Sequence, residues 1–74
     1  MHDNETHTMN ITLNGKPHTV QPGNTVADLV ASLGYQGKRI AVERNGDIVP
    51  KSQHAQVALA HEDSIEIVVA VGGG

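Results

Sequence analysis

The chain has 74 residues and a formal net charge of −3 at neutral pH, and it contains no cysteine, phenylalanine or tryptophan. This length predicts one small domain with an aliphatic core, and the lack of cysteine excludes disulfides, thiolate metal sites and a thiol nucleophile. Because no apolar run approaches roughly 18 residues, no signal peptide is visible and the acidic charge is scattered, we expect a cytoplasmic protein that binds neither membranes nor nucleic acid.

The first elements predicted along the chain are a polar extension and a β-hairpin. Residues 1–8 lack a hydrophobic pattern, so we expect a disordered extension before a domain that spans residues 9–71. Apolar and polar residues alternate over residues 9–13, which predicts a half-buried strand. Asn14-Gly15 indicates a type I′ turn, because both of its central positions need positive φ, and a second strand follows at residues 16–21.

A single amphipathic helix is predicted next. Thr25 is a good N-cap, and Asp28, three residues further on, completes a variant of the capping box. Gly34 stands where a left-handed residue commonly ends a helix. Four apolar residues between these ends recur at helical spacing and predict a face that packs on the core: Val26, Leu29, Val30 and Leu33.

The second half of the chain predicts a further hairpin and a final strand. Residues 40–43 and 47–49 flank Asn45-Gly46, another type I′ signal, and one short helical turn is expected near Ser52. The final strand is predicted at residues 65–71. The order β-β-α-β-β-β indicates an α+β fold, a mixed sheet of about five strands with one main helix across one face. If the last strand pairs beside the first, this is the order of the ubiquitin-like β-grasp.

No group of residues in the sequence predicts a catalytic or metal site. His18, His54 and His61 fall on three different elements, so we expect ordinary surface or half-buried histidines and no metal ligands. Glu62-Asp63 is an adjacent acidic pair of the kind that is usually solvated in a turn. We therefore expect no catalytic residue and no independent catalytic activity in this chain.

The C-terminal residues predict where function lies. Gly72, Gly73 and Gly74 follow a run of β-forming residues, and three extended glycines reach roughly 10 Å. Such a tail, residues 72–74, fits a slot too narrow for any side chain and brings a terminal carboxylate into another protein's active site. Alternation along the last strand places a few apolar and acidic side chains on its outer face, which we expect to be a partner-docking patch: Glu66, Val68 and Ala70.

Two long motifs stand out in the second half of the chain, AVERNGDIVP at residues 41–50 and DSIEIVVAVGGG at residues 63–74, and two shorter ones precede them, ITLNG at residues 11–15 and TVADL at residues 25–29. Together these motifs resemble the ThiS sulfur carriers of thiamine biosynthesis. The family often has an aromatic residue where His54 stands and a glycine where Glu62 stands. These departures predict looser packing near His54 and an altered turn before the last strand.

The resemblance implies a ubiquitin-like β-grasp carrier with no permanently bound cofactor. In this family an E1-like adenylyltransferase consumes ATP and Mg²⁺ to activate the terminal carboxylate, which here would belong to Gly74. Sulfur from a cysteine desulfurase persulfide or another donor then gives a thiocarboxylate, and thiazole synthase uses that sulfur to form the thiazole of thiamine.

Three alternatives stay open on the sequence. The small subunit of molybdopterin synthase shares the fold and the glycine end, but its tail usually carries prolines before the glycines, and Val69-Ala70-Val71 has none. A ubiquitin-like modifier would be joined to lysines through the same adenylate. A plain β-grasp interaction module, whose glycines are inert, would not be activated at all.

Overall fold

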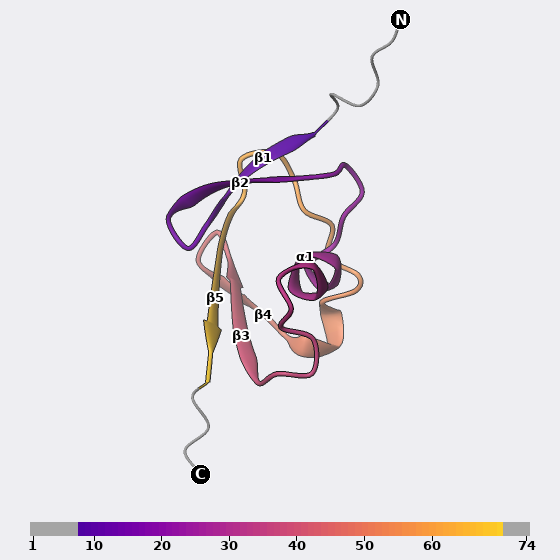
Figure 1. Ribbon diagram of the computed structural model, residues 1–74, viewed down its shortest axis with the longest axis vertical. Helices are drawn as coiled ribbons and strands as arrows, with labels where there is room; N and C mark the ends of the chain where they lie inside the picture. Colours follow the sequence, from indigo (N-terminus) through magenta and orange to yellow (C-terminus); the bar gives the residue numbers. More distant parts are fainter. Residues whose placement is uncertain (1–7, 71–74) are drawn as a thin grey trace, which may run out of the picture.

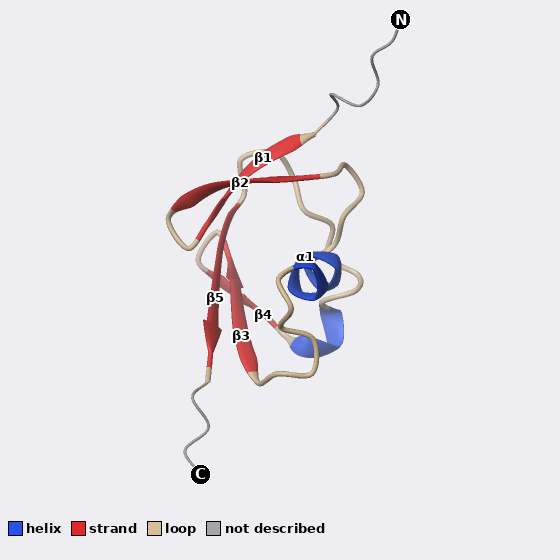
Figure 2. Cartoon of the chain, viewed as in Figure 1, coloured by secondary structure: helices blue, strands red, loops and turns tan. Residues whose placement is uncertain are grey.

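The computed structural model describes residues 8–70, so the predicted tail at residues 72–74, Val71 and residues 1–7 of the predicted extension lie outside the described residues. The described chain forms a five-stranded sheet with one α-helix and one short 3-10 helix (Figures 1 and 2). No helix within residues 8–70 is long and apolar enough to cross a membrane. The elements are β1 (Met9–Leu13), β2 (Lys16–Val20), α1 (Val26–Ser32), β3 (Ile40–Arg44), β4 (Asp47–Val49), the 3-10 helix (Lys51–Gln53) and β5 (Ser64–Val69).

The sheet has the strand order β2-β1-β5-β3-β4, which places the last strand at its centre. β5 runs parallel to β1 and antiparallel to β3, while β1–β2 and β3–β4 are antiparallel hairpins. The helix α1 lies across one face of this sheet (Figure 1). The prediction of a mixed-sheet β-grasp fold with adjacent first and last strands is confirmed.

The core lies between α1 and the inner face of the sheet, and it is entirely aliphatic. Its most deeply buried side chains come from the helix and from two neighbouring strands, as the predicted alternation requires. In α1 the apolar face that was predicted to pack on the core does so, with Leu33 partly buried at its end. The buried hydrophobic residues are Ile11, Val20, Val26, Leu29, Val30, Val42, Val49, Leu59, Ile65 and Ile67.

Both hairpin turns and the helix start are formed as the sequence predicts. Asn14 and Gly15 have φ values of 50° and 82°, and Asn45-Gly46 is likewise left-handed at both positions, which confirms two type I′ turns. At the helix start the Thr25 backbone N–H donates to Asp28 Oδ2 at 2.8 Å, and the Asp28 N–H donates to Thr25 Oγ1 at 3.2 Å. This reciprocal pair is the predicted capping box, and it satisfies two N–H groups that the helix itself leaves free.

His54 is buried, so the expectation of a surface or half-buried histidine was wrong at this position. The side chain is 8% exposed, and its Nε2 lies 3.2 Å from the carbonyl oxygen of Val49. The carbonyl oxygen of His54 also accepts a hydrogen bond from Ala27 at the helix start. The imidazole therefore links the end of β4 to the segment beneath α1, because its polar atom finds a backbone partner inside the fold.

Asp63 is also buried, which corrects the expectation of a solvated acidic pair. Its Oδ2 accepts hydrogen bonds at 2.8 Å from Arg44 Nε and from the Ala60 N–H, while Oδ1 accepts one at 3.0 Å from Asn45. Burial alone would raise the pKa of Asp63, but the hydrogen bonds and the charge of Arg44 outweigh burial and lower that pKa from its ordinary value of 3.8. The carboxylate thus fastens the β3–β4 turn to the start of β5.

Glu62, the other member of that pair, is exposed and adopts a φ of +70°. Its N–H donates to the carbonyl oxygen of Asn10, so the turn before β5 is held against β1. A left-handed conformation is costly for a residue that carries a Cβ, whereas glycine adopts it freely. This backbone conformation accounts for the glycine that the resembled family often has here.

We predict that Glu62→Gly is more stable than Glu62→Ala by about 1 kcal/mol, because only the alanine variant retains the left-handed strain. Both variants lose the same carboxylate, so charge cancels in the comparison. Urea unfolding of the two variants measures the difference. Equal urea midpoints for the two variants would show that the left-handed conformation at residue 62 does not lower the stability of the alanine variant.

We predict that the ion pair of Asp63 makes the native state sensitive to acid. Because the native pKa is lowered, the stabilisation is complete above the ordinary value of 3.8 and is lost as the pH falls through the lower native pKa. Asp63→Asn should lower the free energy of unfolding by about 1–3 kcal/mol at neutral pH and flatten its decline in acid. Asp47→Asn, which removes an exposed carboxylate from the β3–β4 hairpin that Asp63 contacts, is the control. An unchanged acid profile in Asp63→Asn would contradict the assignment.

Candidate functional site

The strand that leads to the predicted tail is the central strand, β5. Ile65 and Ile67 point into the core and are 0% and 5% exposed, while Glu66, Val68 and Ala70 are exposed on the outer face of the sheet. Val68 is 64% exposed, so most of this apolar residue stays in contact with water. The residues predicted as a docking patch therefore lie together on the face opposite α1, and their role in docking stays a prediction.

The neighbouring strands extend this apolar surface. Ala41 on β3 is paired directly with Val68 and is exposed. Ile48 on β4 is 63% exposed and is paired with Glu43, which in turn stands opposite Glu66. We call this surface the outer-sheet patch; it consists of Ala41, Ile48, Glu66, Val68 and Ala70.

Neither Ile48 nor Ala41 was predicted to belong to the outer-sheet patch. In β4 the outward position of Ile48 is visible in the alternation Asp47-Ile48-Val49, once Val49 is assigned to the core. The pairing of Ala41 with Val68 needs the register between β3 and β5, which no local pattern in the sequence gives.

Two asparagine side chains hold β5 from its two sides. Asn14 donates from Nδ2 to the carbonyl oxygen of Ile67 at 3.3 Å and accepts from the Ile67 N–H at 2.8 Å. Asn45 accepts from the Ser64 N–H at 2.8 Å, and its own N–H donates to the Ser64 carbonyl oxygen at 2.7 Å. The two turn residues thus fix the start and the middle of the strand that precedes the tail.

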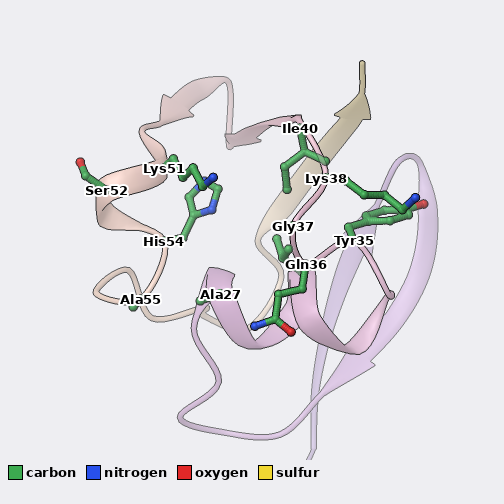
Figure 3. A pocket seen from close by; sticks show the side chains of 11 residues that line it. Ala27, Tyr35, Gln36, Gly37, Lys38, Ile40, Lys51, Ser52, His54 and Ala55 are labelled. Atoms are coloured by element: carbon green, nitrogen blue, oxygen red, sulfur yellow. The ribbon is translucent and has the colours of Figure 1, made fainter. Parts of the chain in front are cut away.

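A hollow of about 230 Å³ lies on the helix side of the sheet, away from the outer-sheet patch. Tyr35 and Lys38 form one side of it, and Lys51 and His54 lie across from them (Figure 3). Its lining includes no carboxylate, and Ser52 on its rim has no recorded partner among the described residues that would activate its hydroxyl. The imidazole of His54 lies within hydrogen-bond distance of the Val49 carbonyl oxygen.

Within residues 8–70 no three potential ligands from histidine, aspartate or glutamate come close enough to hold a metal ion. His18 lies on β2, His54 follows the 3-10 helix, and His61 lies in the turn before β5. His61 Nδ1 accepts a hydrogen bond from the Asn10 N–H at 3.2 Å, so this imidazole connects the turn before β5 to β1.

Comparison with known proteins agrees with this architecture. The sequence profile of the ThiS family matches residues 11–74. The chain is 46% identical over 50 residues to the sulfur carrier protein ThiS of Bacillus subtilis, and the match covers 68% of this chain and 76% of that protein. The crystal structure of the thiamine biosynthesis protein ThiS from Geobacter metallireducens superposes with a TM-score of 0.76 at 32% identity, and covers 89% of this chain and all of that one.

A longer relative matches as well. The chain is 44% identical over 66 residues to a thiazole synthase of Paramagnetospirillum magneticum, and the match covers 89% of this chain. The chain spans only 20% of the length of that relative. The profile match over residues 11–74, the similarity to the Bacillus protein and the shared fold establish that this chain belongs to the ThiS family.

Proposed function

We propose that the protein is a sulfur carrier of thiamine biosynthesis that delivers sulfur from a thiocarboxylate formed at Gly74. The observation that carries the proposal is the ThiS family match, which runs to Gly74 and includes the β-grasp body. Relatives named as a sulfur carrier and as a thiamine biosynthesis protein share the sequence and the fold, respectively. The body is the recognition element, and the glycine tail presents the reacting carbon.

The proposed chemistry begins with activation of a carboxylate, which is itself a poor electrophile at neutral pH. An E1-like adenylyltransferase joins a carboxylate oxygen of Gly74 to the α-phosphorus of Mg²⁺-bound ATP, and pyrophosphate leaves. The terminal sulfur of a cysteine persulfide then attacks the acyl carbon, and AMP leaves with the original oxygen. A thiol reduces the resulting acyl disulfide, which leaves a thiocarboxylate on the carrier and a disulfide on the donor side.

The absence of side chains at Gly72 and Gly73 suits this chemistry. A glycine backbone passes through a channel that a Cβ would block, and it adopts backbone angles closed to other residues. The carrier also contains no cysteine, so none of its side chains can form a disulfide with the persulfide donor. Both features restrict the reaction to the end of the chain.

We propose thiazole synthase as the protein that receives the sulfur. Support comes from the relative of Paramagnetospirillum magneticum, which is named a thiazole synthase and contains a region similar to most of this chain. Since this region makes up 20% of that relative, a carrier-like domain and the remainder of a thiazole synthase share one polypeptide there.

The outer-sheet patch is the surface that we assign to docking of the activating enzyme. Its exposed apolar side chains, Ile48 and Val68, gain from being removed from water, while Glu43 and Glu66 add a local negative charge. A partner surface with apolar residues and a basic rim complements this arrangement. The patch includes the strand that leads into the tail, so docking there brings the C-terminus to the enzyme.

We predict that incubation with an E1-like activating enzyme, Mg²⁺-ATP, a persulfide donor and a thiol adds roughly 16 Da to the intact carrier, as one oxygen becomes sulfur. Fragmentation should place the added mass at Gly74. Gly73→Leu should abolish the gain and leave the unfolding midpoint unchanged, because a leucine side chain blocks the narrow approach. A carrier of unchanged mass would support an inert interaction module, whereas full conversion of Gly73→Leu would contradict the channel argument.

We predict that Val68→Asp raises the KM for the carrier in adenylation at least about tenfold, because it puts a charge into the apolar centre of the outer-sheet patch. Its unfolding free energy should change by no more than about 1 kcal/mol, since Val68 is exposed. Thr19→Asp introduces the same charge at an exposed position of β2, two strands away, and should leave the KM unchanged. Equal KM values for the two variants would contradict the proposed role of the patch in docking.

A further inference from the structure

The central strand β5 is paired along its β1 side over only part of its length. β1 is in register with β5 at two positions, Thr12 with Ser64 and Leu13 with Ile65. On the other side β3 accompanies β5 as far as Val69. Figure 2 shows β5 continuing past the β1–β2 turn toward the C-terminus.

Asn14 ends the ladder on the β1 side. Its backbone N–H donates to the carbonyl oxygen of Ile65 at 2.9 Å. Its side-chain amide then forms hydrogen bonds with both the N–H and the carbonyl oxygen of Ile67, as described above. The side chain therefore substitutes for one more residue of β1, and the chain turns away at Gly15.

The next backbone groups on this side belong to Val69. Backbone groups alternate in direction along a strand, and those of Ile65 and Ile67 point toward β1. The Ala70 N–H points the other way, because it donates to the carbonyl oxygen of Arg39 beside β3. The N–H and C=O of Val69 consequently face the β1 side, where no group within residues 8–70 is recorded as their partner.

We propose that this edge of β5 at Val69 is a strand-addition site for an extended segment of the activating enzyme. The inference rests on the proposed function and adds to it a mode of partner binding. An open edge presents a donor and an acceptor that template a further strand, a recognised way of binding extended segments. The added strand would lie in line with β1, with the Asn14-Gly15 turn limiting it at one end.

The position of the edge argues for this occupant. Val69 lies between the exposed side chains of Val68 and Ala70, so the edge is continuous with the outer-sheet patch. It also lies roughly five residues before Gly74, a span of at most roughly 17 Å when extended. A partner strand paired here would fix the direction in which the tail enters the enzyme, which the side chains of the patch alone would not do.

The first test is amide hydrogen exchange of the ¹⁵N-labelled carrier, free and bound to the activating enzyme with a non-hydrolysable ATP analogue. In the free carrier the Val69 amide should exchange rapidly, whereas the Ile67 and Ala70 amides are protected by Asn14 and Arg39. Binding should slow exchange at Val69 at least about tenfold. An unchanged Val69 rate in a formed complex would overturn the inference.

The second test compares Val69→Pro with Val69→Ala. Both variants lose the valine side chain, but only proline removes the N–H, and edge positions tolerate proline when that N–H has no partner in the sheet. Val69→Pro should raise the KM for the carrier about tenfold over Val69→Ala, with similar unfolding midpoints and little change in kcat. Equal KM values would overturn the inference, and if Val69→Pro does not fold, the exchange result decides.

These outcomes separate the inference from the proposed function. Normal adenylation of the unmodified carrier without protection at Val69 would leave the function standing and remove the strand-addition site. Failure of the unmodified carrier to be adenylated would overturn both. Protection of Val69 in the free carrier that grows with its concentration would assign the edge to a second copy of this chain and contradict the proposed occupant.

Discussion

The structure depends on the central position of β5, the strand that leads into the C-terminal tail. Its inward side chains, Ile65 and Ile67, are buried beneath α1, and its backbone is paired with β1 and β3. The turn residues Asn14 and Asn45 add side-chain hydrogen bonds to that backbone. A strand held from both sides and from one face cannot shift by one residue without exposing its core side chains. The point at which the chain leaves the sheet is therefore fixed.

In the proposed function the folded sheet positions the carrier on the enzyme, and the C-terminus reacts. A terminal carboxylate is useful to an activating enzyme only if the rest of the carrier places it reproducibly, and each loosely ordered residue adds an entropic cost to that placement. Val69 is the last residue of β5, so few residues separate the fixed strand from Gly74. Glu66 and Val68 of the outer-sheet patch lie on the same strand, so in the proposed function one strand serves both docking and delivery.

The sequence predicted the elements well because their signals are local. Alternation located the strands, Asn-Gly pairs located both hairpins, and Thr25 with Asp28 located the helix start. It failed where the partner is distant along the chain: Asp63 looks like half of a solvated acidic pair until Arg44, on β3, is placed beside it. His54 was misjudged for a different reason: its partner, the carbonyl oxygen of Val49, is only five residues away, but the 3-10 helix Lys51–Gln53 is what brings the imidazole back to it. In the candidate site, Glu66, Val68 and Ala70 followed from alternation, but their neighbour Ala41 needed the register of the sheet.

In the proposed function the activating enzyme acts on the C-terminal carboxylate of Gly74. This can be measured as ATP–pyrophosphate exchange by that enzyme with two synthetic forms of the carrier, which differ only in ending as a carboxylate or as an amide. We expect exchange with the carboxylate form and none with the amide form, while both forms bind the enzyme. Exchange of equal rate with the amide form would contradict this expectation.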